Sequence, residues 1–161
     1  MPFATADLCD EFGAEVQVAE PLFRDWGGLE RFTGPIATLR VFEDNALVRQ
    51  ALEGAGEGRV LVVDGGGSLR TALVGGNLAT LAHRNGWSGV VVYGCIRDAV
   101  ELAGTQIGIK ALQSTPRKSA KDGAGERSIP VAFAGVTFAP GAWLYADRDG
   151  IVVAGRPLAK S

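Results

Sequence analysis

A stretch in the middle of the chain combines residue types that suit the binding of an anion and a metal ion. It begins with Gly75-Gly76-Asn77-Leu78 and ends with Arg97-Asp98. Glycines let backbone approach a ligand closely, and the free N–H groups at a helix start favour an anion. Arginine can hold a carboxylate through two hydrogen bonds, and aspartate is a ligand of hard cations such as Mg²⁺. These types favour a site for a small carboxylate and a divalent metal ion.

The elements around this stretch are expected to bring its two ends together. Residues 59–63 and 89–93 are short valine-rich runs, which are typical of strands buried in a parallel sheet, and residues 77–85 have a helical pattern between them. In a β-α-β crossover, the carboxyl ends of both strands and the start of the helix lie at one edge of the sheet. Open α/β sheets bind ligands at that edge. The sequence therefore places the helix start near Arg97 and Asp98.

Glu101 follows the aspartate by three residues. If residues 98–102 begin a helical turn, its carboxylate faces the same way as Asp98 and could orient a water molecule beside the metal. The pattern leaves a plainer interpretation open. An arginine next to an aspartate after a strand is also typical of a structural ion pair, and a glycine pair before a helix is also typical of a simple turn.

Composition limits the other functions that the chain could have. It has 161 residues, a net charge of -2 and a pI near 5.4, so a basic surface for direct nucleic-acid binding is not expected. No apolar run has membrane-spanning length, and residues 1–7 lack a secretory pattern, so we expect a cytoplasmic protein. One histidine, His83, excludes a zinc site built on several histidines within the chain. Cys9 and Cys95 are expected to be reduced thiols.

Several catalytic motifs are missing. Arg70 occupies a position where a nucleophile elbow and a dinucleotide fingerprint both need glycine, and no Gly-Lys pair forms a phosphate loop. Lys110 is the one lysine in an apolar strand pattern, and so the one candidate for a Schiff-base mechanism.

The rest of the sequence predicts one α/β domain over residues 1–161, with a β-rich C-terminal half. A helix is expected over residues 5–12 with Thr5 or Asp7 as its N-cap, and Asp44 or Asn45 should cap a second helix. A helical turn is expected over residues 69–74. Residues 117–127 form a lysine-rich loop, which we interpret as solvated rather than as a lid. Further strands are expected at 36–42, 107–112, 131–133, 136–138, 143–146 and 151–153.

On several of these segments the sequence resembles the class II 4-hydroxy-4-methyl-2-oxoglutarate aldolases, a family that includes proteins called regulator of ribonuclease activity A. The most specific segment joins Gly76 to Arg97-Asp98 and then to Glu101, and it is similar to the form of the family signature with glycine in place of aspartate at the first position. The other matching segments are residues 5–10, 41–45, 62–68, 135–138 and 145–147.

The resemblance implies a swivelling β/β/α domain assembled as a homotrimer. It implies that Gly75, Gly76, Asn77 and Leu78 bind the carboxylate of a 2-oxo acid together with Arg97, and that Asp98 binds Mg²⁺ or Mn²⁺. Arg97, Asp98 and Glu101 would be the catalytic residues, with Glu101 in the role that aspartate at position 76 has in other members.

The resemblance also implies two reactions that release pyruvate through a metal-stabilised enolate. One is cleavage of 4-hydroxy-4-methyl-2-oxoglutarate, for which a water held by Glu101 would be the base, and the other is decarboxylation of oxaloacetate, which needs no such base. The alternative implied by the same family is a regulator that binds and inhibits ribonuclease E, a role that requires neither Asp98 nor a metal.

Overall fold

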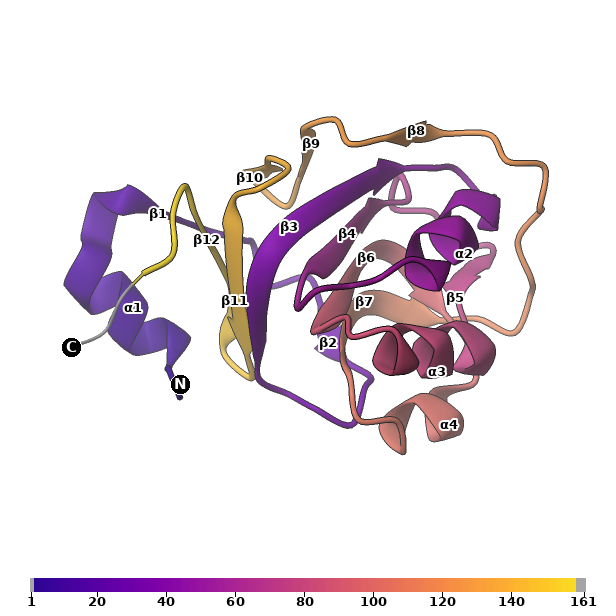
Figure 1. Cartoon of the computed structure of the whole chain (residues 1–161), viewed down its shortest axis with the longest axis horizontal. Coiled ribbons are helices and arrows are strands. Elements are labelled where there is room, and N and C mark those ends of the chain that lie inside the picture. Colours follow the sequence, from indigo (N-terminus) through magenta and orange to yellow (C-terminus); the bar gives the residue numbers. More distant parts are fainter. Residues whose placement is uncertain (1, 159–161) are drawn as a thin grey trace.

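Strand β3 (Phe32–Arg40) belongs to two differently built parts of one sheet in the computed structural model, which describes residues 2–158. Its first half pairs antiparallel with β11 (Trp143–Asp147), and its second half pairs parallel with β4 (Val60–Asp64). The strand order is β1-β12-β11-β3-β4-β6-β7-β2. Because β3 is shared, the antiparallel part curves across one face of the parallel part (Figure 1).

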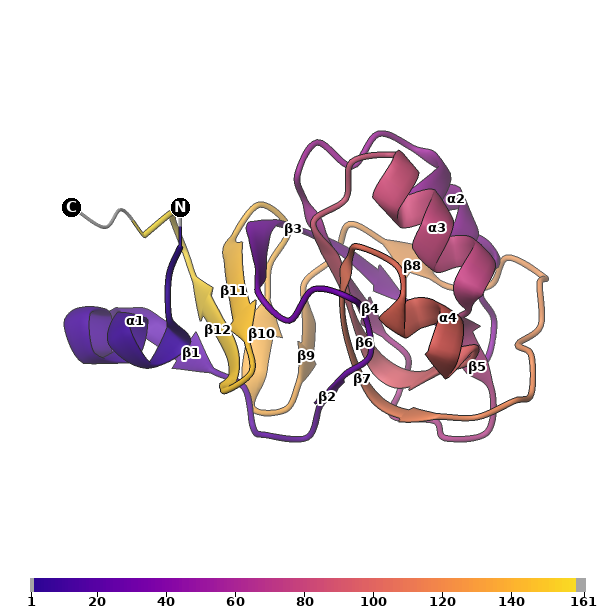
Figure 2. The ribbon, with the colours of Figure 1, turned by 90° about the horizontal axis from the view of Figure 1, so that it is seen from below.

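The parallel part carries helices on its other face. Figure 2 shows these helices on one side of the parallel strands and the antiparallel strands on the other side. The elements of this part are β6 (Gly89–Ile96), β7 (Gly108–Ser114), β5 (Ala72–Val74), α2 (Ala46–Glu53), α3 (Gly76–Arg84) and α4 (Ala99–Ala103).

The antiparallel part carries the N-terminal helix on its outer face (Figure 1). The layers therefore run helix, antiparallel strands, parallel strands and helices, which confirms the predicted β/β/α arrangement. The remaining elements are α1 (Thr5–Phe12), a short 3₁₀ helix (Gly13–Glu15), β1 (Val16–Val18), β12 (Gly150–Ala154), β9 (Val131–Phe133), β10 (Val136–Phe138), β2 (Arg24–Asp25) and β8 (Glu126–Arg127).

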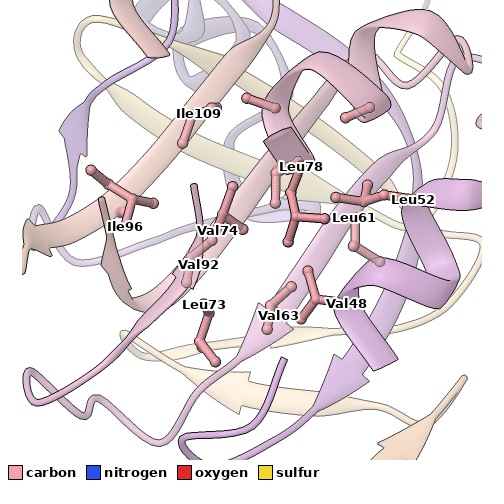
Figure 3. Packing of buried hydrophobic residues seen from close by; sticks show 14 of the residues in the cluster. Val48, Leu52, Leu61, Val63, Leu73, Val74, Leu78, Val92, Ile96 and Ile109 are labelled. Carbon is pink, nitrogen blue, oxygen red and sulfur yellow. The ribbon is translucent and has the colours of Figure 1, made fainter. Parts of the chain in front are cut away.

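Alternation along β4 divides its side chains between two hydrophobic cores, and a third core lies between α1 and the antiparallel strands. Leu61 and Val63 of β4 pack toward the helices, while Val60 and Val62 pack toward the antiparallel strands. Val48 and Leu52 of α2 meet the first pair of side chains (Figure 3). Full burial of a valine or leucine stabilises the fold by about 1.5–3 kcal/mol, so this packing fixes the helices on the sheet.

The helical turn predicted at residues 69–74 is wrong. Ala72, Leu73 and Val74 form strand β5, which pairs parallel with the C-terminal end of β6. All three side chains are buried, and a short continuous apolar run cannot be assigned to helix or strand by its period. Strand β5 leads directly into the glycine pair, so its pairing with β6 fixes where Gly75 and Gly76 lie.

The helix predicted over residues 5–12 is confirmed, but its expected N-cap is wrong. Ala4 occupies the cap position, and Thr5 instead donates from both its amide and its hydroxyl to the Asp147 carboxylate, at 2.7 and 2.6 Å. The Asp149 amide donates a third hydrogen bond to this carboxylate, at 3.0 Å. Burial acts to raise the pKa of Asp147, but these hydrogen bonds outweigh it and lower the pKa below its usual range. Asp147 therefore attaches α1 to the β11–β12 hairpin.

We expect Asp147→Asn to lower the free energy of unfolding by about 1–3 kcal/mol at pH 7, because buried donors lose a charged acceptor. A carboxyl with a lowered folded pKa contributes stability above its unfolded pKa, about 3.9, and this contribution is lost as the pH falls through the folded value. Urea unfolding should therefore show a difference between wild type and variant that shrinks on acidification. Asp10→Asn, on the exposed side of α1, is the control. A difference that is independent of pH would contradict this role.

Candidate active site

A hydrogen bond joins the two ends of the stretch from Gly75 to Asp98. The Gly76 amide donates to Oδ2 of Asp98 at 2.8 Å, and the Arg97 amide donates to the Val74 carbonyl at 3.0 Å. Strands β4 and β6 are parallel neighbours, so the turn after β5, the start of α3 and the end of β6 lie at one edge of the sheet. The predicted meeting of the two ends is therefore present in the structure.

A cavity of about 260 Å³ lies at this edge. Its walls come from the N-terminal half of α2, strand β5, the start of α3, the end of β6 and the loop after β7. Its lining residues are Asn45, Ala46, Arg49, Gln50, Ala72, Gly75, Gly76, Asn77, Leu78, Arg97, Asp98, Lys118, Ser119 and Lys121. Every residue that the sequence placed at the carboxylate and metal sites thus lines one cavity.

Asp98 takes a backbone conformation that suits its position. It is in the left-handed region, at φ 59° and ψ 45°, directly before α4. Aspartate is one of the few residues other than glycine that adopts this region readily. The conformation turns the carboxylate back toward the start of α3, where the Gly76 amide binds one of its oxygens. The side chain is otherwise exposed on the cavity side.

The structural ion pair that the sequence left open is not formed. Within residues 2–158, no contact of 4.0 Å or less joins the Arg97 guanidinium to Asp98, and Arg97 instead donates from Nη1 to the Pro116 carbonyl at 3.5 Å. The guanidinium is half-buried and has donors left for a ligand. The absence of a pair with Asp98 leaves both side chains available to the cavity.

Glycine at positions 75 and 76 makes room for two carboxylates. A Cβ on Gly76 would overlap Oε2 of Glu101, and a Cβ on Gly75 would lie 2.8 Å from Oδ2 of Asp98. Glu101 is on α4, and the predicted helical turn after Asp98 is present as Ala99–Ala103. The Glu101 carboxylate therefore occupies the space next to position 76, although Glu101 is not among the residues that line the cavity.

The side chains at this edge fit a magnesium-like ion better than zinc. In the part of the chain that the structure describes, no three His, Cys, Asp or Glu side chains cluster as a metal site. Mg²⁺ is typically held by one or two carboxylates, with waters and substrate oxygens in the other positions. Asp98 offers one carboxylate oxygen while the Gly76 amide fixes the other, so it suits that kind of coordination.

The interpretation of residues 117–127 as a solvated loop is only partly correct. Most of its side chains are exposed, but Lys118, Ser119 and Lys121 line the cavity. Arg49 of α2, which the sequence pattern did not indicate, also lines the cavity. The lysine-rich composition of the loop was the one available signal, because the contacts that place it come from distant parts of the chain.

Other candidate groups lie away from the cavity. Lys110 is buried, where its ammonium donates to the Asp147 carbonyl at 2.6 Å and pairs with Asp25 at 2.9 Å. His83 is exposed on α3, as predicted. Cys9 and Cys95 are free, and burial raises the pKa of the Cys95 thiol, so that thiol is poorly reactive. Within residues 2–158, no helix is long and apolar enough to cross a membrane.

The fold and the cavity define a β/β/α protein with a cationic pocket at the carboxyl ends of its parallel strands. The model of the RraA-like family, described as Aldolase/RraA, matches residues 5–153, and the chain belongs to that family. A protein of Alkalilimnicola ehrlichii named "Putative 4-hydroxy-4-methyl-2-oxoglutarate aldolase" is 58% identical over 161 residues, with 100% of each chain covered. A protein of Laribacter hongkongensis with the same name is 58% identical over 158 residues, covering 98% of this chain and 99% of that protein.

Two solved structures have the same fold and carry different functional names. The RNA-processing inhibitor RraA from Thermus thermophilis has a TM-score of 0.95 and 52% identity, and the match covers 99% of this chain and 96% of that one. A structure from Geobacillus kaustophilus, named as an S-adenosylmethionine:2-dimethylmenaquinone methyltransferase, has a TM-score of 0.96 and 52% identity, with 99% of each chain covered. The fold is therefore settled by these neighbours, and the function has to be argued from the site.

We expect Asp98→Ala to lower the free energy of unfolding by about 1–2 kcal/mol, because alanine loses the hydrogen bond to Gly76 and tolerates left-handed backbone poorly. Asp98→Asn keeps an acceptor and the tolerated backbone, so its stability should lie within about 0.5 kcal/mol of wild type. Urea titrations followed by circular dichroism measure both values. Equal stability of all three proteins would show that Asp98 does not hold the end of β6 to α3.

Proposed function

We propose that the protein is a divalent-metal-dependent lyase that cleaves 4-hydroxy-4-methyl-2-oxoglutarate and decarboxylates oxaloacetate, in both cases releasing pyruvate. The observation that carries this proposal is the convergence of the helix start at Gly76 with Arg97 and Asp98 in one cationic cavity. The aldolase names of relatives at 58% identity support the same reaction class. Mg²⁺ or Mn²⁺ is the cofactor that the donor set fits.

In this proposal the start of α3 and Arg97 bind the carboxylate of the 2-oxo acid. The amides of Asn77 and Leu78 lie in the first turn of the helix, where N–H groups have no partner within the helix. The guanidinium adds hydrogen bonds to a charged acceptor, each contributing about 1.5–3 kcal/mol. Asp98 holds the divalent ion, which when bound would supply a Lewis acid for the 2-keto oxygen. Substrate and cation thus approach from the same wall of the cavity.

Glu101 is proposed to hold the water that takes the proton from the 4-hydroxyl group. Its carboxylate lies beside Gly76, where other members of the family are expected to have an aspartate. Loss of that proton lets the bond between C3 and C4 break, and the electron pair passes to the pyruvate enolate. Decarboxylation of oxaloacetate reaches the same enolate without a proton transfer from a hydroxyl group, so it does not require this base.

We also propose that the working form is a homotrimer, with a neighbouring subunit close to the site. Val100 precedes Glu101 on α4, and its side chain is 90% exposed. A neighbouring subunit that packed on α4 would cover this side chain, but single exposed apolar side chains are common, and the homotrimer is proposed from the resemblance to the family.

Purified protein with Mg²⁺ or Mn²⁺ should release pyruvate from oxaloacetate in a coupled assay, and EDTA should abolish the release. Asp98→Asn should lower the rate at least about 100-fold, because it removes the charged ligand while keeping the fold. Borohydride should not trap pyruvate on the protein, since Lys110 lies outside the cavity. Full activity of Asp98→Asn, or no activity of the wild type with either metal, would rule out the proposal.

Because Glu101 lies beside Gly76, substitutions at these two positions should affect aldol cleavage in the same way. Gly76→Ala should displace the flexible Glu101 carboxylate, and should therefore reduce aldol cleavage about as much as Glu101→Ala, by roughly 10²-fold or more. The double variant should be no worse than either single one, and all three should decarboxylate oxaloacetate at a rate closer to wild type. Losses that multiply in the double variant would show that the two positions act independently.

A second candidate function is inhibition of a ribonuclease by protein contact. The observation that favours it is the name of the Thermus relative, an RNA-processing inhibitor, at 52% identity over nearly the whole chain. Binding of ribonuclease E would not require a metal ligand, so Asp98→Asn should bind it as wild type does. A pull-down run beside the pyruvate assay tests the two functions separately.

The methyltransferase name of the Geobacillus relative is not favoured for this chain. S-adenosylmethionine carries a cationic sulfonium, whereas the cavity is lined by Arg49, Arg97, Lys118 and Lys121 with Asp98 as the one carboxylate. Asp98 is the one lining residue that could balance the sulfonium, and the proposed function assigns this carboxylate to the divalent ion.

A further inference from the structure

We propose that Asp44 is a positioning residue that fixes the loop at residues 117–127, here called the strap, so that Lys118 and Lys121 hold the second carboxylate of a dicarboxylate substrate. This inference rests on the proposed function of the same cavity. It concerns a buried residue at the start of α2 and a loop more than seventy positions further along the chain.

The Asp44 carboxylate is buried, with 4% of the residue exposed, and it accepts four backbone amides. One is Ala46, the first residue of α2, at 3.1 Å, which is a local contact two residues along the chain. The other three belong to the strap: Asp122 at 3.0 Å, Gly123 at 3.1 Å and Ala124 at 3.4 Å. Only the first of these four hydrogen bonds is made to α2. The remaining three make Asp44 the anchor of the strap.

The strap is also held on the N-terminal side of this anchor. The Ala72 amide donates to the Arg117 carbonyl at 2.8 Å, and the Ser119 hydroxyl donates to the Ala72 carbonyl at 2.7 Å. Ala120 exchanges hydrogen bonds of 2.9 Å with the backbone of Glu43 and Asn45. Lys118 and Lys121 lie between these fixed points, and both line the cavity. Their positions therefore follow from the hydrogen bonds on either side of them.

The charge of the cavity wall exceeds what one carboxylate can neutralise. Four cationic side chains line it, and because Arg49 pairs with Glu53 at 3.6 Å, Arg97, Lys118 and Lys121 face the single carboxylate of Asp98, an excess of two positive charges. If Arg97 and the start of α3 take the first carboxylate of a 2-oxo acid, Lys118 and Lys121 of the strap remain as cationic side chains of the cavity, while Arg49 is paired with Glu53. A second carboxylate fits there. Both proposed substrates, 4-hydroxy-4-methyl-2-oxoglutarate and oxaloacetate, have such a second carboxylate, and the inference is that the strap lysines bind it.

The test compares two ligands that differ in this second carboxylate. Pyruvate has one carboxylate and 2-oxoglutarate has two, and neither has the 4-hydroxyl group that aldol cleavage needs. Calorimetric titration in Mn²⁺ should show that the wild type binds 2-oxoglutarate more tightly. Asp44→Asn should weaken 2-oxoglutarate roughly tenfold, the value of one charged hydrogen bond, and change pyruvate by less than about twofold. A purely structural role would weaken both ligands alike.

Two further sets of variants test whether the strap lysines bind the second carboxylate. Asp122→Asn alters an exposed carboxylate on the strap itself and should change neither dissociation constant. Lys118→Ala with Lys121→Ala leaves Asp44 and the backbone contacts in place, so it decides the case even if Asp44→Asn folds poorly. An unchanged preference for 2-oxoglutarate in this double variant would overturn the inference, and so would equal binding of both ligands by wild type.

Together, the binding measurements and the pyruvate assay separate failure of this inference from failure of the proposed lyase activity. Selective binding of 2-oxoglutarate without any release of pyruvate from oxaloacetate would reject the lyase activity and support the second carboxylate site. Release of pyruvate from oxaloacetate without tighter binding of 2-oxoglutarate than of pyruvate would reject only the inference about Asp44 and the strap. Binding of neither ligand by wild type would overturn both.

Discussion

The hydrogen bond from the Gly76 amide to Asp98 is the interaction on which the site depends. It fixes the first turn of α3 against the end of β6, and so brings the anion-binding amides beside the proposed metal ligand. Aspartate tolerates left-handed backbone better than most residues other than glycine, and the hydrogen bond to Gly76 contributes about 0.5–1.5 kcal/mol. The bond can therefore maintain the conformation that aims the Asp98 carboxylate. Glycine at 75 and 76 leaves room for the Asp98 and Glu101 carboxylates in their present positions, because a Cβ at either position would displace one of them.

The charges around this bond make the proposed cation and the substrate depend on each other. A divalent cation beside Asp98 would be repelled by the cationic side chains on the same cavity wall, among them Arg97. A 2-oxo acid that binds in the cavity brings negative charge to that wall and supplies oxygens to the cation. Each ligand should then raise the affinity of the other by the same factor, as thermodynamic linkage requires. The excess of positive charge favours dicarboxylates for the same reason.

The sequence predicted the β-α-β centre and the convergence of the glycine turn with Arg97 and Asp98, because valine runs, helix pattern and strand ends are local signals. The β/β/α layers were implied only by the resemblance to the family. It did not predict β5, since a buried run of three apolar residues has no readable period. It also missed the inward side of the strap, because Asp44 reaches Asp122–Ala124 through backbone amides that leave no trace in residue type. Thr5 was misassigned for a similar reason: its partner, Asp147, is at the other end of the chain.

The central claim is that Asp98 holds a divalent cation that binds together with the substrate. Electron paramagnetic resonance of Mn²⁺ measures this directly, because free Mn²⁺ gives a strong signal that is lost on binding. The account predicts that wild type binds Mn²⁺ and that pyruvate tightens this binding, while Asp98→Asn, with its fold intact, shows neither effect. Equal Mn²⁺ binding by wild type and Asp98→Asn, unaffected by pyruvate, would contradict it.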